Sequence, residues 1–180
     1  SGAGGKAGSR RSGAGPAPGI HAPRERTRRE SWHRPHRVPR LVHLSDLHFG
    51  RERPEVLDPL RSRIRELDPD LVVVSGDITQ RATRREFELA RSFVNGLERN
   101  VLVVPGNHDV PLYQVGLRLL TPLRRWHEGF GAEPEPCARV GDVAAVGLCS
   151  AHGWTLKHGR LTGGQRRRLA GVLRDVPSAW

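Results

Sequence analysis

Residues 71–80 read LVVVSGDITQ, and this stretch decides the fold of the chain. Its four apolar residues, three of them β-branched, predict a short strand that is buried on both faces. Gly76 and Asp77 follow at once and predict a turn at the carboxyl end of that strand. The same pattern recurs on either side. Residues 41–50, LVHLSDLHFG, and residues 101–110, VLVVPGNHDV, also join a short apolar run to a turn rich in Asp, Asn or His.

Helix signals separate these three apolar runs. After the first run, apolar residues recur every three to four positions as far as Leu67, and Asp68 and Pro69 predict the end of that helix. After the second run, Thr83 and Glu86 have the spacing of a capping box ahead of another apolar face. This alternation of strands and helices predicts the α/β class, with parallel strands joined by crossover helices.

The rest of the chain predicts a change of architecture. Residues 112–127 predict a helix that a proline interrupts. Residues 137–140 and 143–149 predict the two strands of a hairpin that begins a second sheet. Thr162 and Gln165 repeat the capping-box spacing ahead of a last helix.

Charge is unevenly distributed along the chain. The formal net charge is +11, and residues 1–40 hold ten of the thirty Lys and Arg but only two of the nineteen Asp and Glu. Residues 1–38 are rich in Gly, Pro and Arg and poor in bulky apolar side chains, so we expect a disordered basic tail. A nucleic-acid-binding arm and an organelle-targeting segment are alternative interpretations of this tail. Residues 39–180 have the length of one domain.

Composition argues against several classes of protein. No apolar run reaches the roughly 18 residues that cross a bilayer, and no signal-peptide pattern follows the early arginines. We therefore expect a cytoplasmic protein without a membrane partner. Cys137 and Cys149 are too few for a disulfide framework and lack the spacing of a thiolate zinc site.

The three turns predict one shared metal site. Ligands of an open α/β sheet bind beyond the carboxyl ends of the strands, and Asp46, Asp77 and Asn107 each follow such an end. Asp46 and His48 are two positions apart, so both side chains could point the same way and chelate one ion. Asp77 could bridge to a second ion, which the Asn107 carbonyl would bind with His108 beside it.

This set of ligands predicts metal-dependent phosphate chemistry. Nitrogen and oxygen ligands without thiolate favour two divalent ions of manganese, iron or zinc, which activate water and polarise a phosphoryl group. His108 would protonate the departing oxygen or stabilise charge on the phosphoryl group, and Asp109 could orient that histidine. Arg81 is a candidate to bind the substrate phosphate. The expected partner is a small phosphorylated substrate, and nucleic acid could bind through the basic tail.

The motifs also carry a family resemblance. Asp46-Leu47-His48, Gly76-Asp77 and Gly106-Asn107-His108-Asp109, in this order, resemble the first three motifs of the calcineurin-like metallophosphoesterase family. The surrounding stretches look closest to the bacterial branch related to cyclic-nucleotide phosphodiesterases, and the resemblance covers about residues 39–175. It implies a metallophosphoesterase-type β-sandwich flanked by helices, with a dinuclear metal centre that hydrolyses phosphomonoesters or phosphodiesters.

The resemblance implies a role for each motif residue. Asp46 and His48 would bind one metal ion, Asp77 would bridge both ions, and Asn107 would bind the other. His108 would be the catalytic histidine. Hydrolysis of cyclic nucleotides is the implied reaction of the nearest branch. A DNA-processing nuclease of the same family and a non-catalytic remnant or binding module are the alternative functions.

The sequence departs from the family pattern in one respect. The family completes its metal ligands with later histidines, one commonly in a His-His-Pro context and two in a Gly-His-x-His motif, whereas His152 and His158 each precede a glycine. We therefore expect the sequence to correspond to the N-terminal part of an enzyme, incomplete at the C-terminus. A partial ligand set competes poorly with water, so weak metal binding and weak or absent activity are expected for this chain.

Overall fold

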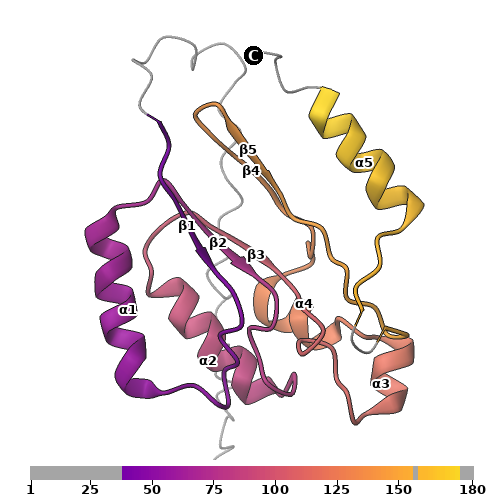
Figure 1. Ribbon diagram of the computed structural model, residues 1–180. Helices are drawn as coiled ribbons and strands as arrows, with labels where there is room; N and C mark the ends of the chain where they lie inside the picture. Colours follow the sequence, from indigo (N-terminus) through magenta and orange to yellow (C-terminus); the bar gives the residue numbers. More distant parts are fainter. Residues whose placement is uncertain (1–37, 156–157, 175–180) are drawn as a thin grey trace, which may run out of the picture.

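The computed structural model describes residues 38–155 and 158–174 (Figure 1). These residues form a three-stranded parallel sheet, a two-stranded antiparallel sheet and five helices. Apart from Val38, the predicted tail lies outside the described residues, so the division of the chain at residue 38 stays a prediction.

The parallel sheet consists of β1 (Leu41–Leu44), β2 (Leu71–Ser75) and β3 (Val101–Val104), in the order β1-β2-β3. Leu41 lies opposite Leu71, and both strand pairs are parallel. The predicted strands and the α/β class are therefore confirmed. Because all three strands run the same way, the three polar turns that follow them lie at one edge of the sheet.

The two crossover helices have the limits that their sequences predict. Helix α2 (Arg84–Asn95) begins with the capping box, in which Thr83 Oγ1 accepts a hydrogen bond from the Glu86 amide at 3.3 Å. Glu86 Oε2 in turn accepts a hydrogen bond from the Thr83 amide at 3.1 Å. Two amide groups that have no backbone partner at the start of the helix are thus satisfied. Helix α1 (Pro54–Leu67) ends at Asp68, whose left-handed backbone stops the helix.

Helices cover one face of the parallel sheet, where α1, α2 and α4 (Arg124–Phe130) pack (Figure 1). Phe93 is fully buried, its ring centre lies 5.6 Å from that of Phe49, and the Arg61 guanidinium lies 5.0 Å above it. Phe49 directly follows His48, so the core anchors the turn after β1. The main buried side chains on this face are Phe49, Ile64, Val72, Val74, Ile78, Phe87, Phe93, Leu97, Trp126 and Phe130.

A hairpin of β4 (Cys137–Val140) and β5 (Val143–Val146) packs against the other face, on Leu102 and Val104 of β3. Strand β5 of this hairpin is three residues shorter than the predicted strand at residues 143–149. It ends opposite Pro136, whose carbonyl accepts a hydrogen bond from the Gly147 amide at 2.7 Å but which has no amide hydrogen to continue the ladder.

The predicted helix at residues 112–127 is divided at the proline into α3 (Val115–Leu120) and α4. Helix α5 (Gly163–Arg174) begins with the second predicted capping box, in which Thr162 Oγ1 accepts from the Gln165 amide at 3.2 Å. Among the described residues, no helix combines the length and the apolar character that crossing a bilayer requires.

The packing of Phe93 predicts that Phe93→Ala lowers the free energy of unfolding by about 3–5 kcal/mol, because the change removes a fully buried aromatic ring and leaves a cavity. Leu89 lies on the same helix with 39% of its surface exposed, so Leu89→Ala is the matched control, with an expected loss below about 1 kcal/mol. Urea denaturation measures both. Equal losses for the two variants would contradict the described core.

Candidate metal centre

The turns after β1 and β2 run side by side at the carboxyl edge of the sheet. The Asp46 amide donates to the Gly76 carbonyl at 3.3 Å, and the His48 amide donates to the Asp77 carbonyl at 3.0 Å. These backbone bonds extend the pairing of the two strands into their turns. The residues that carry the candidate ligands are thus aligned by the backbone itself.

The backbone of these turns is unusual. Asp46, His48 and Asp77 all have positive φ angles, of 55°, 45° and 48°. Left-handed backbone at a residue other than glycine costs about 1–3 kcal/mol and persists only where the surrounding structure imposes it. Here the paired turns impose it, and the three side chains gather as a result.

Three side chains form a cluster suited to a cation. One ligand atom from each of Asp46, His48 and Asp77 lies within 4.8 Å of the others, and His48 Nε2 is 3.8 Å from Asp46 Oδ1. In the described part of the chain, no arginine or lysine forms an ion pair with either carboxylate, and the buried His48 Nδ1 has no hydrogen-bond partner. Two neighbouring carboxylates beside an imidazole fit a divalent ion, because a cation relieves their mutual repulsion.

Gly106 allows the turn after β3 to reach this cluster. A Cβ atom at Gly106 would collide with the backbone nitrogen and Oδ1 of Asp77, so no larger residue fits without displacing the carboxylate. The close approach lets the His108 amide donate to Asp77 Oδ1 at 2.9 Å. It also brings Asn107 to the same edge.

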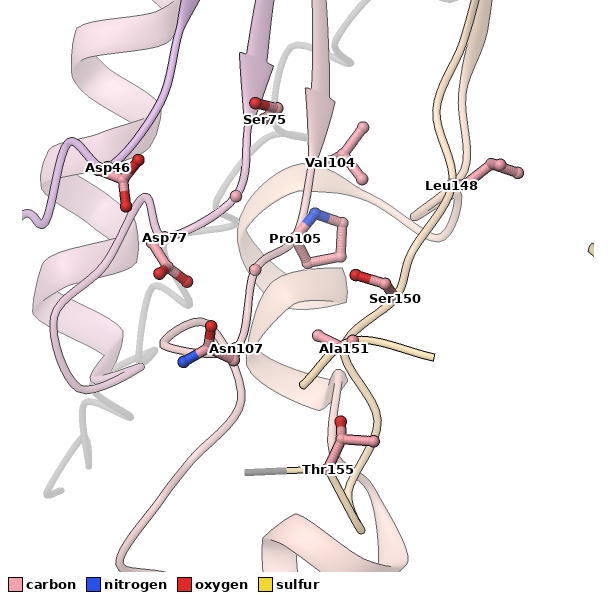
Figure 2. Close-up of a pocket in the computed structure, with 13 residues that line it drawn as sticks. Asp46, Ser75, Asp77, Val104, Pro105, Asn107, Leu148, Ser150, Ala151 and Thr155 are labelled. Atoms are coloured by element: carbon pink, nitrogen blue, oxygen red, sulfur yellow. The ribbon is translucent and has the colours of Figure 1, made fainter. Parts of the chain in front are cut away.

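A cavity of about 270 Å³ opens beside the carboxylates. Figure 2 shows Asp46, Asp77 and Asn107 along one side of it, with Ser150 and Thr155 across from them. The full lining consists of Asp46, Ser75, Gly76, Asp77, Val104, Pro105, Gly106, Asn107, Leu148, Ser150, Ala151, Thr155 and Gly159.

His108 is held by one ring nitrogen. Its Nδ1 lies 2.9 Å from the Gln80 carbonyl oxygen, which can only accept, so Nδ1 carries a hydrogen and Nε2 is left available to the site. The ring lies edge-on to that of His48, with 4.9 Å between the ring centres. The structure therefore brings together all five residues that the sequence singled out as metal ligands or catalyst.

Asp109 acts differently from the prediction that it orients His108. Its buried carboxylate accepts hydrogen bonds from Gly106 N and Thr79 N, both at 2.8 Å, from Thr79 Oγ1 at 2.8 Å, and from Ile78 N at 3.2 Å. Burial raises the pKa of this carboxyl to about 6, while the hydrogen bonds act in the opposite direction. Asp109 thus joins the turns after β2 and β3, and the Gln80 carbonyl holds the His108 ring.

The other predicted residue, Arg81, is exposed and is not among the residues that line the cavity. Sequence reasoning missed Gln80, Ser150 and Thr155. No residue pattern indicates that a backbone carbonyl will hold His108. The hydroxyl residues come from a segment far from the three motifs, so only the fold reveals them.

The close approach at Gly106 predicts that Gly106→Ala weakens Mn²⁺ binding at least tenfold, because the added methyl group displaces Asp77. Gly116→Ala is the matched control, since a Cβ atom at Gly116 meets nothing within 4 Å. Calorimetric titration with Mn²⁺ measures both variants. Unchanged affinity in Gly106→Ala would show that Asp77 does not bind the ion.

Comparisons with known proteins agree with this geometry. The family model described as calcineurin-like phosphoesterase matches residues 39–174. The glycerophosphodiester phosphodiesterase GpdQ of Enterobacter lignolyticus (strain SCF1) is 34% identical over 85 residues, which cover 38% of this chain and 29% of that protein. The probable glycerophosphodiester phosphodiesterase GpdQ of Arcobacter nitrofigilis is 46% identical over 41 residues, 23% of this chain and 15% of that protein. Each match thus spans less than a third of the relative. With the family model matching most of its length, the chain belongs to the calcineurin-like phosphoesterase family.

Proposed function

We propose that this chain carries the catalytic residues of a phosphoesterase that hydrolyses phosphodiester or phosphomonoester bonds at a dinuclear metal centre. The observation that supports this most is the gathering of Asp46, His48 and Asp77 within 4.8 Å, with both carboxylates lining a cavity. We further propose a β-sandwich, in which the parallel sheet and the hairpin are parts of the two facing layers.

The proposed ligand roles follow the positions of the side chains. Asp46 and His48 share one turn and would bind one ion, while Asp77 lies between that turn and Asn107 and would bridge to a second ion. Manganese, iron and zinc suit this set of ligands. When bound, the ions supply Lewis-acid activation of water and of the phosphoryl group.

His108 is the proposed general acid. The Gln80 carbonyl accepts a hydrogen bond from Nδ1, which holds the ring and leaves Nε2 without this contact. A proton carried on Nε2 would pass to the departing oxygen of the ester. Asp109 and Gly106 support this arrangement by keeping the turns after β2 and β3 together.

The volume and the lining of the cavity indicate what size and kind of substrate would fit. The cavity volume of about 270 Å³ lies just below the range of about 300–1,000 Å³ typical of ligand pockets, and none of the described residues that line the cavity is aromatic. Recognition would therefore rest on the phosphodiester and small polar substituents rather than on a stacked base. We propose a small diester, of the glycerophosphodiester kind for which the relatives are named, with cyclic nucleotides as the alternative substrate class.

The proposal predicts that the chain hydrolyses bis(4-nitrophenyl) phosphate in the presence of Mn²⁺ or Fe²⁺. Asp77→Ala is expected to lower kcat/KM at least about 100-fold, because it removes the bridging carboxylate. Asp58→Ala removes a carboxylate whose side chain is 85% exposed on α1 and is expected to leave the rate unchanged.

Nitrophenolate release, followed by absorbance, measures all three proteins. Activity that survives Asp77→Ala would contradict the mechanism. Tight metal binding without turnover in the unaltered chain would contradict the catalytic proposal and favour a non-catalytic binding module.

A further inference from the structure

In one segment of the chain, every charged residue is basic. Residues 38–142 contain fifteen Lys and Arg against sixteen Asp and Glu, whereas residues 143–174 contain six Lys and Arg and no acidic residue. Between residues 38 and 174, the net positive charge therefore resides in residues 143–174, which include α5. A charge asymmetry of this kind is typical of a surface that meets a polyanion.

The arginines of this segment are turned outward. Arg166, Arg167 and Arg174 are exposed on α5, at spacings that share one side of a helix, and Arg160 is exposed just before it. Arg168 alone turns inward, where it forms an ion pair with Glu135 at 2.9 Å.

The four outward arginines have no acidic partner among the residues that the structure describes. Helix α1 differs, because two of its arginines pair with carboxylates on the same helix: Arg61 with Asp58 at 3.1 Å and Arg63 with Glu66 at 3.0 Å. Within the described part of the chain, the outward charge on α5 is therefore available to a ligand.

This basic surface starts at the rim of the cavity. Gly159 lines the cavity, and the next residue, Arg160, donates its amide to the Ser150 carbonyl at 3.0 Å. Gln165 Nε2 donates to the Cys149 carbonyl at 2.6 Å, which fixes the start of α5 against the same wall. From there α5 runs away from the cavity, on the hairpin side of the molecule (Figure 1).

We propose that Arg160, Arg166, Arg167 and Arg174 form a phosphate-tracking surface that binds a nucleic-acid strand and leads one of its phosphodiesters to the cavity. The twelve residues of α5 span about 18 Å, and phosphates of one strand recur about every 3.4 Å along a duplex, so the surface parallels about five phosphates. This inference rests on the proposed function, since it extends the substrate from a small diester to a polynucleotide.

The packing of α5 favours nucleic acid over an anionic membrane. A helix that lies on a bilayer turns a continuous apolar face to the lipid. In α5 the apolar residue Val172 faces the hairpin instead, across a small cavity that it shares with Ala138 and Ala144. Leu173 is the one large apolar side chain exposed on α5.

The test is binding of a fluorescein-labelled single-stranded 20-nucleotide DNA to the full chain, measured by anisotropy over a range of salt concentrations without added metal. The double variant Arg166→Gln/Arg167→Gln is expected to bind about tenfold more weakly at 50 mM salt, with a slope of log K against log salt that is smaller by about 1.4. Arg63→Gln/Arg65→Gln removes the same charge from exposed positions on α1 and is the matched control, with affinity expected to stay within about twofold.

Equal losses in the two double variants, or no binding of the DNA by the unaltered chain, would overturn the inference. So would binding to phosphatidylserine vesicles that depends on Arg166 and Arg167 while DNA binding does not. Since no metal is added, the result is independent of turnover. DNA binding through α5 in a chain that lacks metal-dependent hydrolysis would contradict the proposed function. It would still support the inference that the arginines of α5 bind nucleic acid.

Discussion

The contact between the turn after β3 and Asp77 is the constraint on which the rest of the site depends. It exists because Gly106 has no side chain and because buried Asp109 accepts hydrogen bonds from both turns, through Gly106 N and Thr79 N. An unpaired buried amide costs about 1–3 kcal/mol, so these bonds hold the two turns together strongly. Without this contact, Asn107 and His108 would not lie beside the carboxylates.

The hydrophobic core also helps to hold the turns of the candidate centre in place. Phe49, next to His48, is buried against Phe93 of α2, and α2 itself begins at a capping box directly after the turn that carries Asp77. Packing of one helix therefore positions two turns of the candidate centre. The left-handed backbone of Asp46, His48 and Asp77 can persist because the surrounding packing and hydrogen bonds outweigh its strain.

Local signals in the sequence predicted the features that local chemistry determines. The strand limits at Leu41–Leu44 and Val101–Val104, both capping boxes and the break near Pro122 follow from residue type and spacing. The gathering of the polar turns followed from parallel strand order alone. Features that depend on tertiary contacts did not follow. The Gln80 carbonyl, the role of Asp109, the far wall at Ser150 and the early end of β5 all need the packed fold.

We propose that residues from three separate turns share a pair of cations. The most direct test is anomalous X-ray diffraction from crystals of the chain grown with Mn²⁺, recorded at the manganese edge. We expect two peaks about 3.5–4 Å apart, one beside Asp46 and His48 and the other beside Asn107, with Asp77 between them. No peak at this edge of the sheet under saturating Mn²⁺, or peaks only on another face of the molecule, would contradict this proposal.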